Sequence, residues 1–148
     1  MLKMIHPVAG AIALLTISIF WLSTLFAELF GSEAFVVSVK TSIPQGFFVL
    51  VPALMTTGGT GLVLSKGGRA GAIGAKLKRM PFIAANGLLV LIPAALFLAS
   101  KARAGEFDTA FYAVQALELL AGATNITLLA LNMRDGLRMK GRLRRAPA

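Results

Sequence analysis

Long runs of hydrophobic residues dominate the chain, and they fall into four blocks. A helix that crosses the hydrocarbon core of a bilayer needs about 20 mostly apolar residues. Four stretches meet this requirement, at residues 7–30, 44–64, 81–100 and 109–132. Three of them begin with proline, which suits the first turn of a helix because its missing N–H costs nothing there. The pattern predicts an all-α fold, namely an integral membrane antiparallel four-helix bundle.

Other interpretations of the four blocks fit the sequence less well. A helix of a soluble bundle carries a continuous polar stripe, and none of the blocks has one. Transmembrane strands alternate with a period of two, which these runs do not. The first block could be a cleaved signal peptide, because Lys3 precedes it and residues 32–34 loosely resemble a cleavage site. Its apolar stretch is longer than the usual signal-peptide core, so we expect an uncleaved span.

The composition agrees with a membrane protein of one domain, residues 1–148. Hydrophobic residues make up 57% of the chain and charged residues 14%, where a soluble domain has about 25% charged. The chain contains no cysteine, which excludes disulfides, thiolate metal sites and cysteine nucleophiles. We expect no enzyme, since the sequence shows no catalytic constellation.

Basic residues are unevenly distributed between the spans. If the N-terminus lies inside, twelve of the 15 Lys and Arg residues fall on the inner side, and only Lys40, Lys101 and Arg103 on the outer side. The positive-inside rule then places both termini, the loop 66–79 and the basic tail 133–148 in the cytoplasm. These charges hold the topology and meet anionic lipid headgroups. The tail has no recognition motif for nucleic acid, so we expect no nucleic-acid partner.

The glycine-rich segment 67–76 lies in the expected second loop and invites comparison with a phosphate-binding loop. It lacks the Gly-Lys-Ser/Thr sequence, and no predicted strand precedes it. We therefore expect a flexible cytoplasmic linker there.

Polar residues inside the spans are the candidate site residues, because a polar group in hydrocarbon must face the protein interior or water. On the fourth span the spacing puts Gln115, Glu118 and Asn125 on one helix face. On the first span one face carries His6, Gly10, Ala13, Ile17, Thr24 and Glu28. Depth along the spans predicts two polar clusters. His6, Asn86 and Asn125 lie toward the inner boundary, and Glu28, Gln115 and the deeper Glu118 lie toward the outer one.

Glu118 has two interpretations. It could carry a proton or contact an ion or ligand, or it could be a structural residue that is protonated or paired with Lys40 or a hydroxyl. In both cases we expect its carboxyl to face the bundle interior, beside polar groups of the first or second helix.

His6 also has two interpretations. It could ligate haem or a metal, but b-type cytochromes usually supply a pair of histidines and this chain has one. A structural role at the membrane interface is the alternative. The sequence therefore predicts no metal and no cofactor, with haem as a remaining possibility.

The second span contains Pro52 followed by the glycine-rich run 56–61. Proline and clustered glycines both weaken a helix. We expect a bend or break between Pro52 and Gly61, serving either close helix packing or a hinge.

Three segments, residues 78–87, 105–108 and 131–136, carry a resemblance to a known family. The chain resembles small four-helix bacterial inner-membrane proteins that have no assigned activity. The resemblance implies a bacterial inner (plasma) membrane location and a four-helix fold. It implies no activity and no binding residues.

These observations favour an accessory or assembly subunit that packs against a larger membrane complex. One alternative is a small proton-coupled carrier or channel using Glu118, as a homo-oligomer. A second alternative is a haem-binding membrane electron carrier using His6. The lipid bilayer is the expected partner in every case.

Overall fold

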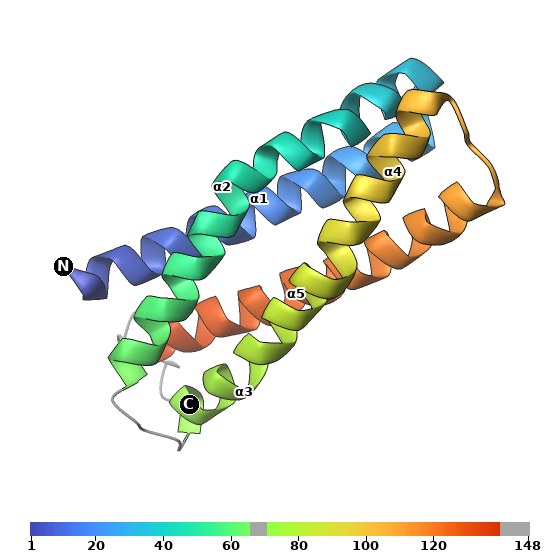
Figure 1. Cartoon of the computed structure of the whole chain (residues 1–148). Helices are drawn as coiled ribbons and strands as arrows, with labels where there is room; N and C mark the ends of the chain where they lie inside the picture. Colours follow the sequence, from blue (N-terminus) through green and yellow to red (C-terminus); the bar gives the residue numbers. More distant parts are fainter. Residues whose placement is uncertain (66–70, 140–148) are drawn as a thin grey trace, which may run out of the picture.

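The computed structural model describes residues 1–65 and 71–139, and almost all of them are helical (Figure 1). The helices are α1 (Leu2–Phe30), α2 (Glu33–Ser65), α3 (Gly71–Asn86), the π-helical turn η1 (Gly87–Leu91), α4 (Ile92–Ala104) and α5 (Thr109–Met139). No strand forms in these two ranges. Because α3, η1 and α4 follow one another without a gap, the described chain consists of four long helical rods.

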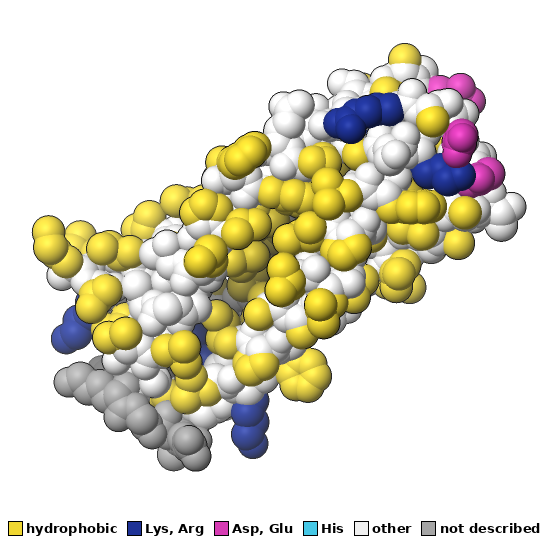
Figure 2. Space-filling model, in the orientation of Figure 1, with side chains coloured by type: hydrophobic (Ala, Val, Ile, Leu, Met, Phe, Trp, Pro, Cys, Tyr) yellow, Lys and Arg dark blue, Asp and Glu magenta, His cyan; other side chains and the backbone are white. Residues whose placement is uncertain are grey.

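All four rods are long and apolar enough to cross a membrane, with mean hydropathy between 1.5 and 2.3. Their large hydrophobic side chains also point outward. Figure 2 shows hydrophobic side chains spread over most of the visible face, whereas charged side chains gather toward its two ends. Phe48, for example, is 85% exposed, and Leu89 and Leu120 are each 71% exposed. Such surfaces are typical of helices that contact lipid or another apolar surface.

The rods pack around two groups of buried hydrophobic side chains. α1 contacts α2 along most of its length, α2 also contacts α4, and α5 contacts α1 and α3 (Figure 1). One group is Ala13, Ile17, Leu50, Ala53, Ile83 and Leu129. The other is Ala27, Val36, Leu98, Ala102 and Phe111. Several of these residues are alanines, which let helix backbones approach closely.

The helices begin earlier or end later than the hydrophobic blocks. α2 begins at Glu33 rather than Pro44, so that proline lies inside the helix. The expected linker 67–76 is helical from Gly71 onward, and its residues 67–70 lie outside the described residues. α5 continues through the first part of the expected tail to Met139, and residues 140–148 are not described. Hydropathy detects only the apolar part of a helix. These helices continue into polar residues at their ends, so they are longer than the hydrophobic blocks.

We expected either a bend or a break between Pro52 and Gly61, and α2 is one continuous helix from Glu33 to Ser65, so no break occurs there. The helix instead changes direction near its middle (Figure 1). Pro44 and Pro52 lie in this part, and each removes a backbone hydrogen bond. Further along, the hydroxyl of Thr57 donates to the carbonyl of Ala53 at 2.7 Å. This type of bond bends helices without breaking them.

The π-helical turn η1 was not foreseen from the sequence. Its wider turn is closed by the N–H of Ile92, which donates to the carbonyl of Gly87 five residues earlier. Pro93 follows directly and cannot donate to the preceding turn. A π turn next to a proline accommodates this loss and keeps the rod continuous.

The connection between α4 and α5 is held by charged side chains. Gly105 adopts a left-handed conformation, with φ 69°. The Nζ atom of Lys101 forms ion pairs with Oε2 of Glu106 and Oδ2 of Asp108, each at 2.7 Å. Asp108 also accepts the N–H of Phe111 at 2.9 Å, which caps the first turn of α5. The Lys101 ammonium and the Phe111 N–H both hold the pKa of Asp108 below its ordinary value.

Gly122 allows α1 and α5 to approach closely, and this generates a prediction. The indole N–H of Trp21 donates to the carbonyl of Leu119 at 2.8 Å, and a Cβ at Gly122 would lie 2.9 Å from the indole Cδ1. We expect Gly122→Ala to lower the free energy of unfolding by about 1–3 kcal/mol, because the anchored indole must shift. Thermal unfolding in a mild detergent measures this effect.

Gly59→Ala is the matched control, because nothing lies within 4 Å of the Cβ it would add. Its stability should equal that of the wild type or exceed it by up to about 1 kcal/mol, since alanine favours helix. A Gly122→Ala protein as stable as Gly59→Ala would contradict the account of this helix crossing.

Candidate functional site

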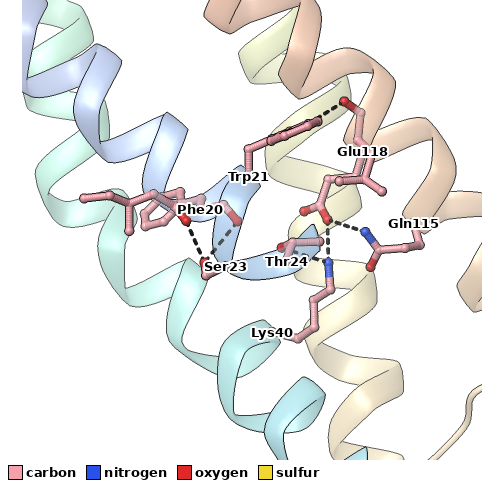
Figure 3. A network of polar contacts seen from close by, with 9 residues as sticks. Phe20, Trp21, Ser23, Thr24, Lys40, Gln115 and Glu118 are labelled. Carbon is pink, nitrogen blue, oxygen red and sulfur yellow. Dashed lines mark hydrogen bonds and ion pairs between the residues drawn. The ribbon is translucent and has the colours of Figure 1, made fainter. Parts of the chain in front are cut away.

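A buried ion pair links α2 to α5. The Nζ atom of Lys40 lies 2.6 Å from Oε2 of Glu118, and the two side chains are 1% and 12% exposed (Figure 3). The hydroxyl oxygen of Thr24 on α1 lies 3.4 Å from the same Nζ. Gln115, one turn before Glu118, donates its Nε2 to Oε2 at 3.4 Å. The network therefore connects three of the four rods through one ammonium group.

The local sequence of α2 directs Lys40 into the interior. Val36, Lys40 and Ile43 are buried and follow one another at helical spacing, so they form one stripe. Lys40 is the only charged member of that stripe. A buried ammonium is costly unless a carboxylate and further acceptors compensate it, and Glu118 and Thr24 supply both.

A small cavity adjoins the ion pair between α1, α2, η1, α4 and α5. Its volume is about 50 Å³, and Thr24 and Glu118 contribute its polar wall. The remaining lining is almost entirely apolar, including Ile17, Leu50 and Leu91. A space of this size admits water-sized species, and it is too small for a larger solute.

Glu28 adds a second carboxyl to this region. It lies one turn after Thr24 on α1, and the charges of both Lys40 and Glu118 act on it. Its Oε1 is buried without a hydrogen-bond partner, and so is Oε1 of Gln115. In the described part of the chain these are the only two buried side-chain N or O atoms without a partner. Both oxygens are hydrogen-bond acceptors. The region therefore contains fewer hydrogen-bond donors than acceptors.

A second polar cluster joins the third rod to α5. Asn86 donates its Nδ2 to Oδ1 of Asn125 at 2.9 Å and to the carbonyl of Ala121 at 2.8 Å. Asn125 is 1% exposed and donates to the carbonyl of Ile83 at 3.3 Å. Each amide thus satisfies a backbone carbonyl of the opposite helix, which is a structural use of both side chains.

His6 lies apart from both clusters. Its Nδ1 is 3.0 Å from the hydroxyl of Thr60 on α2, and Gly61 leaves room for the ring, because an added Cβ would lie 3.2 Å from Cε1. Within residues 1–65 and 71–139, no group of three His, Cys, Asp or Glu side chains is placed to hold a metal ion.

A third group of polar contacts, between α3 and α5, was not predicted from the sequence. Arg79 on α3 lies 2.7 Å from Asp135 on α5 and donates to Asn132 at 3.3 Å. The hydrophobic blocks had assigned Arg79 to a loop and Asp135 to the tail. Both residues lie in helices, and 56 positions separate them. No local pattern in a single sequence reports such a pairing.

The structure groups the predicted polar residues as follows. Gln115 and Glu118 contact each other, Glu28 lies near them, and Asn86 contacts Asn125. The inward orientation expected for Glu118, beside polar groups of the first two helices, agrees with its contacts to Lys40. The placement of Lys40 in an outer loop was wrong, because it is a buried residue of α2. The apolar residues Val36 and Ile43, which flank Lys40 at helical spacing, were the sequence signal that it lies in a buried helix face.

No protein-family model matches the chain, and neither a curated protein nor a solved structure matches it. The function is therefore inferred from the contacts within the chain itself.

Proposed function

We propose that this chain is an accessory or assembly subunit of a larger membrane complex, and that it forms an antiparallel four-helix bundle in a bacterial inner membrane. The observation that carries the proposal is the Lys40–Glu118 pair. Lys40, the most buried charged side chain among the described residues, binds Glu118 at 2.6 Å. These contacts link α1, α2 and α5, which is a structural use of both charged groups.

The arrangement of charges supports the membrane location. The helix α3, whose sequence includes Lys76, Lys78 and Arg79, lies toward the same end of the molecule as the N-terminus and the end of α5 (Figure 1). Glu106 and Asp108 lie at the opposite end, where Figure 2 shows the acidic side chains. With the basic end in the cytoplasm, both termini are cytoplasmic, as the positive-inside rule requires.

The outer surface supports a role in assembly. The interior offers a cavity of about 50 Å³, which is too small to bind a metabolite. Many exposed side chains of the rods are large and apolar. Aromatic ones gather where α1 ends and α2 begins, and there the ring of Phe26 packs against those of Phe30 and Phe35. Aromatic residues are enriched at interfaces between proteins and at membrane boundaries.

Purification of the full chain from its native membrane in a mild detergent tests the proposal. We expect the chain to elute as part of a larger assembly with another membrane protein in fixed stoichiometry. A homo-oligomer without any partner would overturn the proposal and favour a carrier. A haem absorbance band in the pure chain would instead favour an electron carrier that uses His6.

Glu28 supports one other candidate function, a small proton-coupled carrier or channel. The outer cluster combines two carboxyls, Glu28 and Glu118, with one ammonium, Lys40, and the Oε1 of Glu28 has no donor. One lysine neutralises only one carboxylate, so proton binding at the other changes the net charge of the cluster by one unit. Intramembrane carboxyls with this property occur in proton relays.

Proton flux into liposomes that contain the protein and a pH-sensitive dye tests this candidate. If the cluster carries protons, the wild type dissipates an imposed pH gradient faster than protein-free liposomes. Glu28→Gln and Glu118→Gln should then abolish the excess flux, because an amide of the same shape cannot titrate. Glu33→Gln, at the exposed start of α2, is the matched control. Equal flux with and without wild-type protein would rule out the candidate.

A further inference from the structure

A groove between α3 and α5 is lined by two short stripes of side chains. Lys78, Phe82 and Asn86 of α3 are four residues apart and therefore share one face of that helix. Thr124 and Leu128 of α5 form the opposite wall, also four residues apart. The groove is open along the surface of the protein and has a volume of about 470 Å³.

The groove is polar and positively charged at one end. Arg79 lies beside Lys78, but its guanidinium is bound to Asp135 at 2.7 Å. Asp135 is also 3.5 Å from Arg134, so two basic side chains contact one carboxylate. Lys78 is exposed and lies at the end that carries this excess of positive charge. An anionic group is the complement of such a surface.

The chemistry changes along the groove. Lys78 and Asn86 are eight residues apart, which is about 12 Å along the helix. Between them the exposed ring of Phe82 and the side chain of Leu128 provide apolar walls. A cation next to an apolar channel fits an amphiphile with an anionic headgroup and a hydrocarbon chain. A free phosphate would leave the apolar part of the groove unused.

We propose that this groove binds one anionic phospholipid, with its phosphate at Lys78 and an acyl chain against Phe82 and Leu128. The proposal rests on the membrane location given above, because the charged end of the groove then lies at the cytoplasmic headgroup level. There anionic lipids attract basic side chains, and apolar residues deeper in the bilayer contact acyl chains. The site is independent of any partner protein.

Native mass spectrometry of the full chain, released from detergent with equal amounts of dioleoylphosphatidylglycerol and dioleoylphosphatidylcholine, tests the site. We expect one phosphatidylglycerol retained per chain in preference to phosphatidylcholine. Lys78→Ala should lower its apparent affinity about fivefold, the usual effect of one basic side chain near anionic lipid. Phe82→Ala should also weaken retention, because it removes an apolar wall.

The controls are Arg103→Ala, an exposed basic residue near the other end of the molecule, and Phe48→Ala, an exposed ring outside the groove. Both should retain the lipid as the wild type does. Equal retention of the two lipids, or an equal loss in Lys78→Ala and Arg103→Ala, would overturn the proposal. Displacement of the lipid by inorganic phosphate at the same concentration would also overturn it. Preferential retention without a co-purifying protein would support the lipid site while rejecting the assembly role.

Discussion

The cost of an unpaired charge in a nonpolar interior constrains this structure more than any other single factor. Lys40 is 1% exposed, and its charge must be compensated within the protein. Glu118 provides that compensation from another helix, 78 positions away in sequence. A buried pair of this kind adds little net stability compared with well-packed apolar residues, yet it strongly disfavours arrangements that separate the partners. It therefore favours arrangements of the helices in which Lys40 of α2 faces Glu118 of α5.

Buried polar groups without charge also need partners, although leaving one unpaired costs less free energy than leaving a charge unpaired. Thr24 of α1 contributes a hydroxyl to the ion pair, and the indole of Trp21, also on α1, bonds to the backbone of α5. Closer to the other end, Asn86 and Asn125 satisfy carbonyls across the third rod and α5. In a bilayer, the setting proposed for this chain, hydrophobic burial gives no preference between helix and lipid contacts, so polar contacts and close packing would determine which faces meet.

The sequence predicted the helical class and the four apolar rods, because hydropathy and helical spacing are local properties. It also grouped the polar residues of the two clusters, except that His6 lies apart from the inner cluster to which it was assigned. It did not predict the partners. Lys40 was assigned to a loop because the hydrophobic block began at Pro44, although Val36 and Ile43 continue its stripe. The pairing of Arg79 with Asp135 depends on how distant helices cross. No local pattern in a single sequence shows which residues of distant helices come into contact.

A double-mutant cycle on Lys40 and Glu118 tests the central claim most directly. Unfolding free energies in mild detergent would be measured for Lys40→Met, Glu118→Leu and the double variant. If the pair organises the fold, each single substitution costs about 3–5 kcal/mol, because it leaves one buried charge without a partner, and the double variant costs less than either. Single effects that are small, or that simply add in the double variant, would show that the two side chains do not depend on each other.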